Sequence, residues 1–291
     1  MSRLYPHTGG AFRVGVTGPP GVGKSTLVSG LVEACRSRGL CVGVISVDPS
    51  SPFSMGAVLG DRIRLASHFL DRGVFIRSMG ARGHLGGLAE ATLQAVWILE
   101  ASGMDVIFME TVGVGQSEVE IVSLADAIVL VLMPGSGDSV QALKAGVMEI
   151  PDFIVVNKMD HPAAQATVSK IKSMVTIGNG EGNRHPAVVE TQAVSGEGVS
   201  ELWDHLAEHS LRQAGGLEAG RGDDIEGRLL ALAERKLGEM LAIEAREKTG
   251  FLDVLTRARV REVDSLTAAD ALVAEFLRGR RMDDDPSCGL T

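Results

Sequence analysis

Several residue types are scarce in this sequence, and each shortage excludes a class of protein. The 291 residues include 1 tyrosine, 2 tryptophans and 3 cysteines. Cys35, Cys41 and Cys288 show no paired spacing, so neither a disulfide framework nor a zinc site is expected. Acidic residues outnumber basic ones, and the formal net charge of -9 disfavours a nucleic-acid partner, because phosphate backbones select basic surfaces.

Long apolar runs are missing as well. The first residues lack an apolar core of signal-peptide length, and charged or polar residues interrupt the later apolar runs. We therefore expect a soluble, cytoplasmic protein that does not associate with a membrane. The hydrophobic content of 45% suits either one large α/β domain or such a domain with a small appendage.

The segment Gly18–Thr26 carries the most informative motif. Its sequence, GPPGVGKST, matches G-x-x-x-x-G-K-[ST] and stands between an apolar run and a predicted helix start. Backbone N–H groups and a helix N-terminus surround phosphates in such a loop. We expect Lys24 to reach the β- and γ-phosphates of a nucleoside triphosphate, and Ser25 to bind Mg²⁺. The other phosphate-loop contacts are assigned to Gly18, Pro20, Gly21, Val22, Gly23 and Thr26.

Short apolar runs alternate with amphipathic stretches over residues 12–215, which predicts a mostly parallel sheet with helices on both faces, as in a P-loop NTPase. Residues 1–11 are interpreted as an N-terminal tail. The expected strands are Phe12–Thr17, Cys41–Val47, Val74–Arg77, Val106–Glu110, Ala127–Met133, Phe153–Asn157 and Ala187–Thr191, with helices over Leu85–Glu100 and Ala163–Met174.

A Gly-rich polar stretch, Arg212–Asp224, marks a change in composition. Beyond it, apolar residues recur at helical spacing over Ile225–Glu247, Leu252–Arg259 and Ser265–Leu277. The segment 216–291 is therefore a predicted helical extension. Either it packs as a cap on the core domain or it serves as a dimerisation arm.

The sequence Asn157-Lys158-Met159-Asp160 follows a predicted buried strand. In nucleotide-binding α/β domains Asn-Lys-x-Asp at a strand end recognises guanine. The aspartate accepts hydrogen bonds from the guanine N1–H and amino group, the lysine stem lies along the base, and the asparagine ties the loop to the phosphate loop. Adenine would leave the carboxylate unpaired, so we predict GTP rather than ATP. Gln192, Ala193 and Val194 follow the next strand as a second base-contacting loop, in which the Ala193 N–H approaches guanine O6.

Three carboxylates at or near the strand ends suit a magnesium site, because Mg²⁺ prefers hard oxygen ligands. They are Asp48, Asp61 and Glu110. Glu110 opens a Glu-Thr-Val-Gly sequence similar to the Asp-x-x-Gly of GTPase second switches, where the Gly113 N–H would contact the γ-phosphate. Gln116 either orients the attacking water or neighbours a helix N-cap.

With these residues in view, the chain resembles the MeaB/ArgK family of methylmalonyl-CoA mutase-associated GTPases, which is similar to the signal-recognition and MinD-like class of P-loop proteins. The matching stretches are GPPGVGKST, VDPSSPFSMGAVLGDRIRL, FIRSMGARGHLGGLA, ETVGVGQSE, MPGSGDSVQALKAGVMEI and NKMD. They extend along the whole predicted core domain.

The resemblance implies a chaperone that uses GTP binding and hydrolysis to gate cofactor loading, protection and reactivation of an adenosylcobalamin-dependent acyl-CoA mutase. It implies a homodimer that binds GTP or GDP with Mg²⁺ through Lys24, Ser25, Asp48, Asp61 and Glu110. It also implies a switch loop toward the mutase, with Asp138, Gln141 and Lys144 as its candidate residues.

Two other functions are alternatives. A metal-insertion GTPase, as for nickel enzymes, usually shows His/Cys clusters, which this sequence lacks. A small-molecule kinase would need an acceptor pocket but no guanine-recognition sequence. The sequence therefore favours a GTPase that acts on a mutase.

Overall fold

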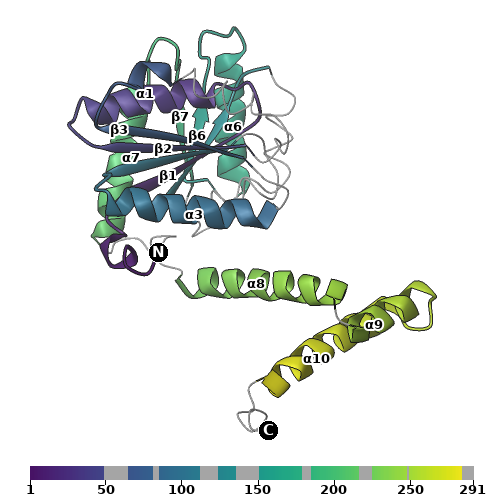
Figure 1. Ribbon diagram of the computed structural model, residues 1–291. Helices are drawn as coiled ribbons and strands as arrows, with labels where there is room; N and C mark the ends of the chain where they lie inside the picture. The colour runs from purple at the N-terminus through teal and green to yellow at the C-terminus, as the bar shows by residue number, and fades with distance from the viewer. Residues whose placement is uncertain are drawn as a thin grey trace. The chain divides into compact units, whose positions relative to one another are not determined.

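A computed structural model describes residues 1–48, 65–80, 85–111, 124–135, 151–178, 185–215, 225–247 and 249–283. The chain divides into two compact units, residues 1–223 and 224–291 (Figure 1). No helix of the described residues is both long and apolar enough to cross a membrane.

The first unit is built on a seven-stranded parallel sheet, which confirms the predicted α/β fold. The strand order is β3-β2-β4-β1-β5-β6-β7. All the predicted strands are present, with their ends moved by at most three residues: β1 Phe12–Thr17, β2 Val42–Asp48, β3 Val74–Gly80, β4 Val106–Thr111, β5 Ala127–Leu132, β6 Phe153–Val156 and β7 Ala187–Glu190.

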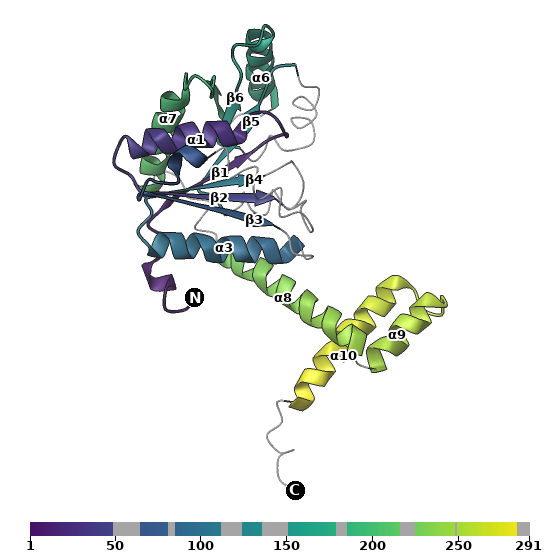
Figure 2. The same ribbon diagram turned by 45° about the horizontal axis from the view of Figure 1, so that its top comes forward.

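Helices cover both faces of this sheet, because successive side chains of a strand point to opposite faces. α1 (Lys24–Arg36) lies over one face and α3 (Leu85–Ala101) over the other (Figures 1 and 2). α6 (Ala164–Gly178) packs on Leu130, Leu132 and the strand residues beside them. β4 and β5 are buried along their whole length, in agreement with the apolar sequences of β5 and of residues 106–109 in β4.

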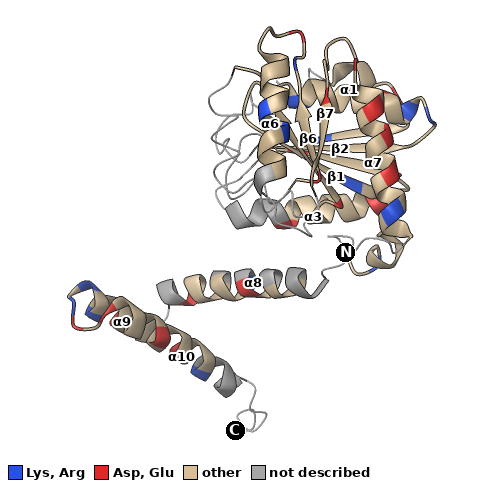
Figure 3. Ribbon diagram, turned by 180° about the vertical axis from the view of Figure 1, so that it is seen from behind, with Lys and Arg blue, Asp and Glu red and all other residues tan. Residues whose placement is uncertain are grey.

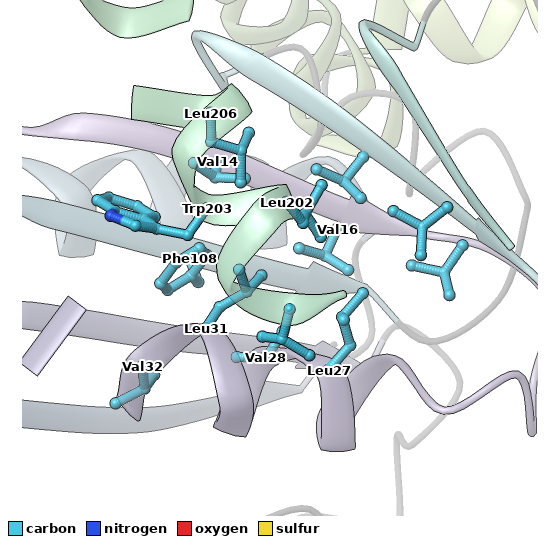
Figure 4. Close-up of a cluster of buried hydrophobic side chains, with 14 of the residues drawn as sticks. Val14, Val16, Leu27, Val28, Leu31, Val32, Phe108, Leu202, Trp203 and Leu206 are labelled. Atoms are coloured by element: carbon cyan, nitrogen blue, oxygen red, sulfur yellow. The ribbon is translucent and has the colours of Figure 1, made fainter. Parts of the chain in front are cut away.

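The largest apolar cluster joins α1, the sheet and α7 (Val199–Ala214). Figure 4 shows Leu27, Val28 and Leu31 of α1 beside Leu202, Trp203 and Leu206 of α7, with Val14, Val16 and Phe108 from the strands. Fully burying one such leucine stabilises the fold by about 1.5–3 kcal/mol. The cluster therefore fixes the helix that begins at Lys24 firmly on the sheet. α7 was not among the predicted helices, and it extends into the first residues of the predicted connector.

Cys35 lies within this cluster, and burial raises the pKa of its thiol from 9.0 to about 12. At pH 8 its thiolate fraction is therefore about 10³-fold lower than that of an ordinary thiol. We expect iodoacetamide to label Cys41, which is only partly buried, long before Cys35 in the native protein. Mass spectrometry of the labelled peptides would check this, and equal labelling rates would contradict it.

The same pKa shift predicts a dependence of stability on pH. The folded state holds the Cys35 proton more tightly than the unfolded chain does. The contribution of this thiol to the free energy of unfolding is therefore fully present below pH 9. It is lost as the pH rises from 9 toward 12, because the unfolded chain then releases the proton while the folded protein still holds it.

Three helices form the described part of the second unit: α8 (Ile225–Glu247), α9 (Thr249–Arg259) and α10 (Ser265–Asp283). They confirm the predicted helical extension. Phe251 and Phe276 are buried between them, and Asp264 caps α10 by accepting hydrogen bonds from the N–H groups of Leu266 and Thr267 at 3.0 and 3.1 Å. The hydrogen bond from the Thr267 hydroxyl, and then those from the two N–H groups, lower the pKa of Asp264. Large apolar side chains on α8 remain exposed: Leu229, Leu230, Leu237 and Ile243.

Candidate nucleotide site

The predicted phosphate loop connects β1 to α1 at the carboxyl edge of the sheet. Lys24 is the first residue of α1, and its side chain is 6% exposed. Its Nζ donates hydrogen bonds to the carbonyl oxygens of Gly18 at 2.8 Å and Pro19 at 3.0 Å. The ammonium group is therefore held against the loop that would surround the phosphates, within a low-dielectric setting that strengthens its field.

Two glycines of this loop are required by their surroundings. Gly18 has φ 141°, and a Cβ placed there would lie 2.2 Å from the Val131 carbonyl oxygen. Gly23 has φ 97°, and its Cβ would lie 2.5 Å from Asn157 Nδ2. The motif glycines thus let the loop approach both β5 and the chain that follows β6.

Ser25 and Glu110 meet beside this loop. The Ser25 hydroxyl donates a hydrogen bond to Glu110 Oε1 at 2.7 Å, and both residues are buried. Asp48 ends β2, the strand next to β4. Within the described part of the chain no group of three or more His, Cys, Asp or Glu side chains gathers as a metal site. The paired oxygens of Ser25 and Glu110 are nevertheless of the hard type that suits Mg²⁺.

Asn157 connects three segments that are distant in the sequence. Its Nδ2 donates to the Val22 carbonyl oxygen at 2.8 Å, which joins it to the phosphate loop. Its Oδ1 accepts hydrogen bonds from the Thr191 hydroxyl at 3.1 Å and from the Ala193 N–H at 3.0 Å. The N–H that we expected at guanine O6 thus lies on the Asn157 side chain. This residue sets the separation of the two predicted base loops.

Lys158 and Asp160 lie at the surface beside Asn157. Lys158 has φ 61°, and its Nζ donates to the Gly21 carbonyl oxygen at 2.8 Å and lies 3.3 Å from Met133 Sδ. Its stem therefore extends toward the phosphate loop. Val194 lies in the tight turn after β7 and is 89% exposed. This turn is closed by a hydrogen bond of 3.0 Å from the Gln192 N–H to the Glu197 carbonyl oxygen.

The structure brings together the predicted phosphate-loop, base-loop and Glu110 residues at one edge of the sheet. Six further predictions fall outside the described residues: Asp61, Gly113, Gln116, Asp138, Gln141 and Lys144. For Asp48 the structure describes the backbone but not the side chain.

Two residues that pattern reasoning did not assign help to build the base loops. Thr191 is buried and bonds Asn157 through its hydroxyl. Gly198 has φ 75°, and a Cβ there would lie 2.1 Å from the Glu190 carbonyl oxygen. The glycines of the sequence SGEG were the available signal, because a turn with positive φ favours glycine.

The described features define a P-loop GTPase. The sheet is parallel, the phosphate loop follows β1, and the sequence Asn-Lys-x-Asp follows β6. The chain belongs to the family described as methylmalonyl Co-A mutase-associated GTPase MeaB, which it matches over residues 1–246. The protein is thus a GTPase.

Individual relatives agree with this assignment. A protein of Pyrococcus abyssi with a provisional GTPase name is 46% identical over 285 residues, covering 96% of this chain and 87% of its own. The methylmalonic aciduria type A homolog of Mus musculus is 37% identical over 216 residues, which are 72% of this chain and 52% of that protein. Among solved structures, LAO/AO transport system kinase superposes with a TM-score of 0.68 at 26% identity, over 95% of this chain and 85% of that one.

Proposed function

We propose that this GTPase is a chaperone of an adenosylcobalamin-dependent acyl-CoA mutase of the methylmalonyl-CoA mutase type. In this role, GTP binding and hydrolysis gate the loading of the cofactor and the protection or reactivation of the mutase. The membership in a family described as mutase-associated is the observation that carries the proposal. The name of the mouse relative, which refers to methylmalonic aciduria, supports it.

The chemistry proposed for the site is attack of water on the γ-phosphate, assisted by charge neutralisation and positioning. Lys24 supplies a buried positive charge beside the phosphate loop. Ser25, Asp48, Asp61 and Glu110 would hold Mg²⁺, which neutralises developing charge on the phosphates when it is bound. The hydrogen bond of 2.7 Å between the Ser25 hydroxyl and Glu110 Oε1 supports this assignment, because both oxygens are of the hard type that Mg²⁺ prefers.

Recognition of the base is assigned to Asp160, with Lys158 along one side of the ring. The hydrogen bond from Asn157 to the Val22 carbonyl oxygen supports this assignment, because it joins the proposed base loop to the phosphate loop. Val194, which is exposed on the second loop, is proposed to add an apolar contact with the guanine.

We further propose that the protein acts as a homodimer through the segment 216–291. The exposed leucines of α8 support this part of the proposal, because such side chains are normally covered in an assembly. Asp138, Gln141 and Lys144 are proposed as the contact toward the mutase. A cytoplasmic setting remains a prediction of the composition.

The proposal is tested by GTP turnover, with ATP as the control nucleotide, measured alone and with a cobalamin-dependent acyl-CoA mutase of the same organism. We expect turnover of GTP only and stimulation by the mutase, because a partner can complete a site that works by positioning. Turnover of GTP that no mutase changes would refute the chaperone role and retain the GTPase. Transfer of the phosphoryl group to a small molecule would favour the kinase alternative.

A further inference from the structure

Asp160, the residue proposed to read the base, stands in a tight turn whose end residues are Lys158 and His161. The His161 N–H donates to the Lys158 carbonyl oxygen at 3.0 Å, which closes this turn. Lys158 Nζ lies 3.3 Å from Met133 Sδ at the end of β5. The His161 ring lies against Gly135, two residues further along the same chain segment. Both ends of the turn therefore contact the chain that leaves β5.

The part of the turn before Asp160 is held by two further contacts. Lys158 Nζ donates to the Gly21 carbonyl oxygen of the phosphate loop at 2.8 Å. The Met159 N–H donates to the Thr191 carbonyl oxygen at 3.2 Å, in the loop that follows β7. These contacts fix the backbone on one side of Asp160 only.

The part of the turn after Asp160 is held through His161. Its Nδ1 accepts a hydrogen bond from the Ala163 N–H at 3.1 Å, and its carbonyl oxygen accepts one from the Ala164 N–H at 2.9 Å. Gly135 has φ 77°, and a Cβ placed there would lie 3.3 Å from His161 Cε1. The ring thus occupies space that a glycine leaves open. His161 joins the turn to the first residues of α6 and to the end of β5.

The position of the Asp160 carboxylate depends on this backbone. Asp160 is exposed, and no described residue donates a hydrogen bond to its side chain. In the proposed complex it must accept hydrogen bonds from two guanine donors at once, and hydrogen bonds weaken steeply once their angle falls below about 120°. A small rotation of the turn would therefore reduce both contacts together.

We propose that His161 is a positioning residue for guanine recognition. Its ring holds the second end of the turn between β5 and α6, and this directs the Asp160 carboxylate toward both guanine donors. The inference rests on the proposed role of Asp160, and His161 itself touches no nucleotide in it. Because His161 is exposed, its replacement removes little buried area and should leave the unfolding midpoint unchanged.

The chain provides a matched control at the other end of α6. His185 Nδ1 lies 3.1 Å from the carbonyl oxygen of Val175, in the last turn of this helix. Basic residues lie on α6 and acidic ones on α7 (Figure 3), and a change of charge could by itself affect the binding of an anionic nucleotide. His161→Ala and His185→Ala each remove one histidine, so they change the composition of the chain equally.

The test measures the affinity of the full-length protein for a fluorescent GDP analogue in the presence of Mg²⁺. For His161→Ala we expect affinity to fall about three- to tenfold, the range for loss of one hydrogen bond that orders a site. His185→Ala should match the wild type. His161→Asn should bind within about twofold of the wild type, because an asparagine side chain accepts a hydrogen bond from the N–H two residues on, here that of Ala163.

A double-mutant cycle then tests whether His161 acts through Asp160. In an Asp160→Ala background, where the carboxylate is absent, His161→Ala should cause no further loss of affinity for the GDP analogue. Two residues that contribute independently would instead show effects that multiply. A purely structural role for His161 would therefore not give the expected coupling.

Three outcomes overturn the inference. Equal affinities of His161→Ala and His185→Ala would show that the ring has no part in guanine binding. The same loss in the Asp160→Ala background as in the wild type would separate His161 from the carboxylate. A loss in His161→Asn as large as that in His161→Ala would remove the hydrogen bond with Ala163 from the explanation.

A failure of the proposed function gives a different result. In that case the wild-type protein would bind an ADP analogue as tightly as the GDP analogue, or Asp160→Ala alone would leave the affinity for the GDP analogue unchanged. The role of His161 is therefore tested separately from the assignment of the base.

Discussion

Lys24→Ala is expected to lower GTP turnover by about 10²–10³-fold, the usual effect of removing one preorganised donor at a developing charge. The Lys24 ammonium is buried and bonded to the carbonyl oxygens of Gly18 and Pro19, so its charge is fixed in place before the nucleotide arrives. Alanine leaves the loop without a cation at the point where the γ-phosphate charge grows. Single-turnover hydrolysis of GTP would measure the loss.

The control for this variant is Lys172→Ala. Lys172 is an exposed lysine of α6 that pairs with Glu190 at 3.2 Å, and such surface pairs contribute about 0–1 kcal/mol to stability. We expect wild-type turnover for Lys172→Ala and a retained circular dichroism spectrum for both variants. Unaltered turnover of Lys24→Ala would remove the lysine from the proposed mechanism.

The sheet could be predicted from the sequence because its strands are buried on both faces. β5 reads AIVLVL and is buried at every position, so an apolar run of the right length was sufficient evidence. The phosphate loop could be predicted because its backbone requires positive φ angles, as at Gly23, and glycine adopts them most readily. Such features depend on residues that are close together in the chain.

Contacts between distant residues could not be predicted in the same way. Arg36 and Asp71 are each one of many charged residues, and nothing in their sequence context pairs them. The Ala193 N–H donates to Asn157 Oδ1, which lies 36 residues away in the sequence, and no local pattern indicates this pairing. α7 was not predicted, and its packing against α1 depends on a sheet whose strands are distant from one another in the sequence.

The second large effect is expected for Asp160→Asn, which should weaken GTP binding by about 10²–10³-fold. The carboxylate accepts two hydrogen bonds from guanine in the proposed complex, and a charge-assisted hydrogen bond contributes about 1.5–3 kcal/mol. An asparagine offers one acceptor oxygen and one donor N–H₂ group. The N–H₂ group would face a guanine group that is also a donor, so one of the two hydrogen bonds is lost. Fluorescence titration with a GTP analogue would measure the affinity.

Xanthosine triphosphate makes this prediction specific to the base. Xanthine has a carbonyl oxygen where guanine has its amino group, and this oxygen can accept a hydrogen bond from the asparagine amide. Asp160→Asn should therefore gain affinity for xanthosine triphosphate while it loses affinity for GTP, and its affinity for ATP should stay low.

This reversal separates base recognition from a general loss of structure. Asp160 is exposed and stands at the turn after Lys158, so the substitution removes no buried contact and should leave the unfolding midpoint unchanged. A damaged site would lower the affinity for GTP and for xanthosine triphosphate alike. A changed hydrogen-bonding pattern lowers the affinity for GTP and raises the affinity for xanthosine triphosphate. If Asp160→Asn binds GTP as tightly as the wild type does, the carboxylate does not read the base, and guanine selection must come from the loop that contains Ala193.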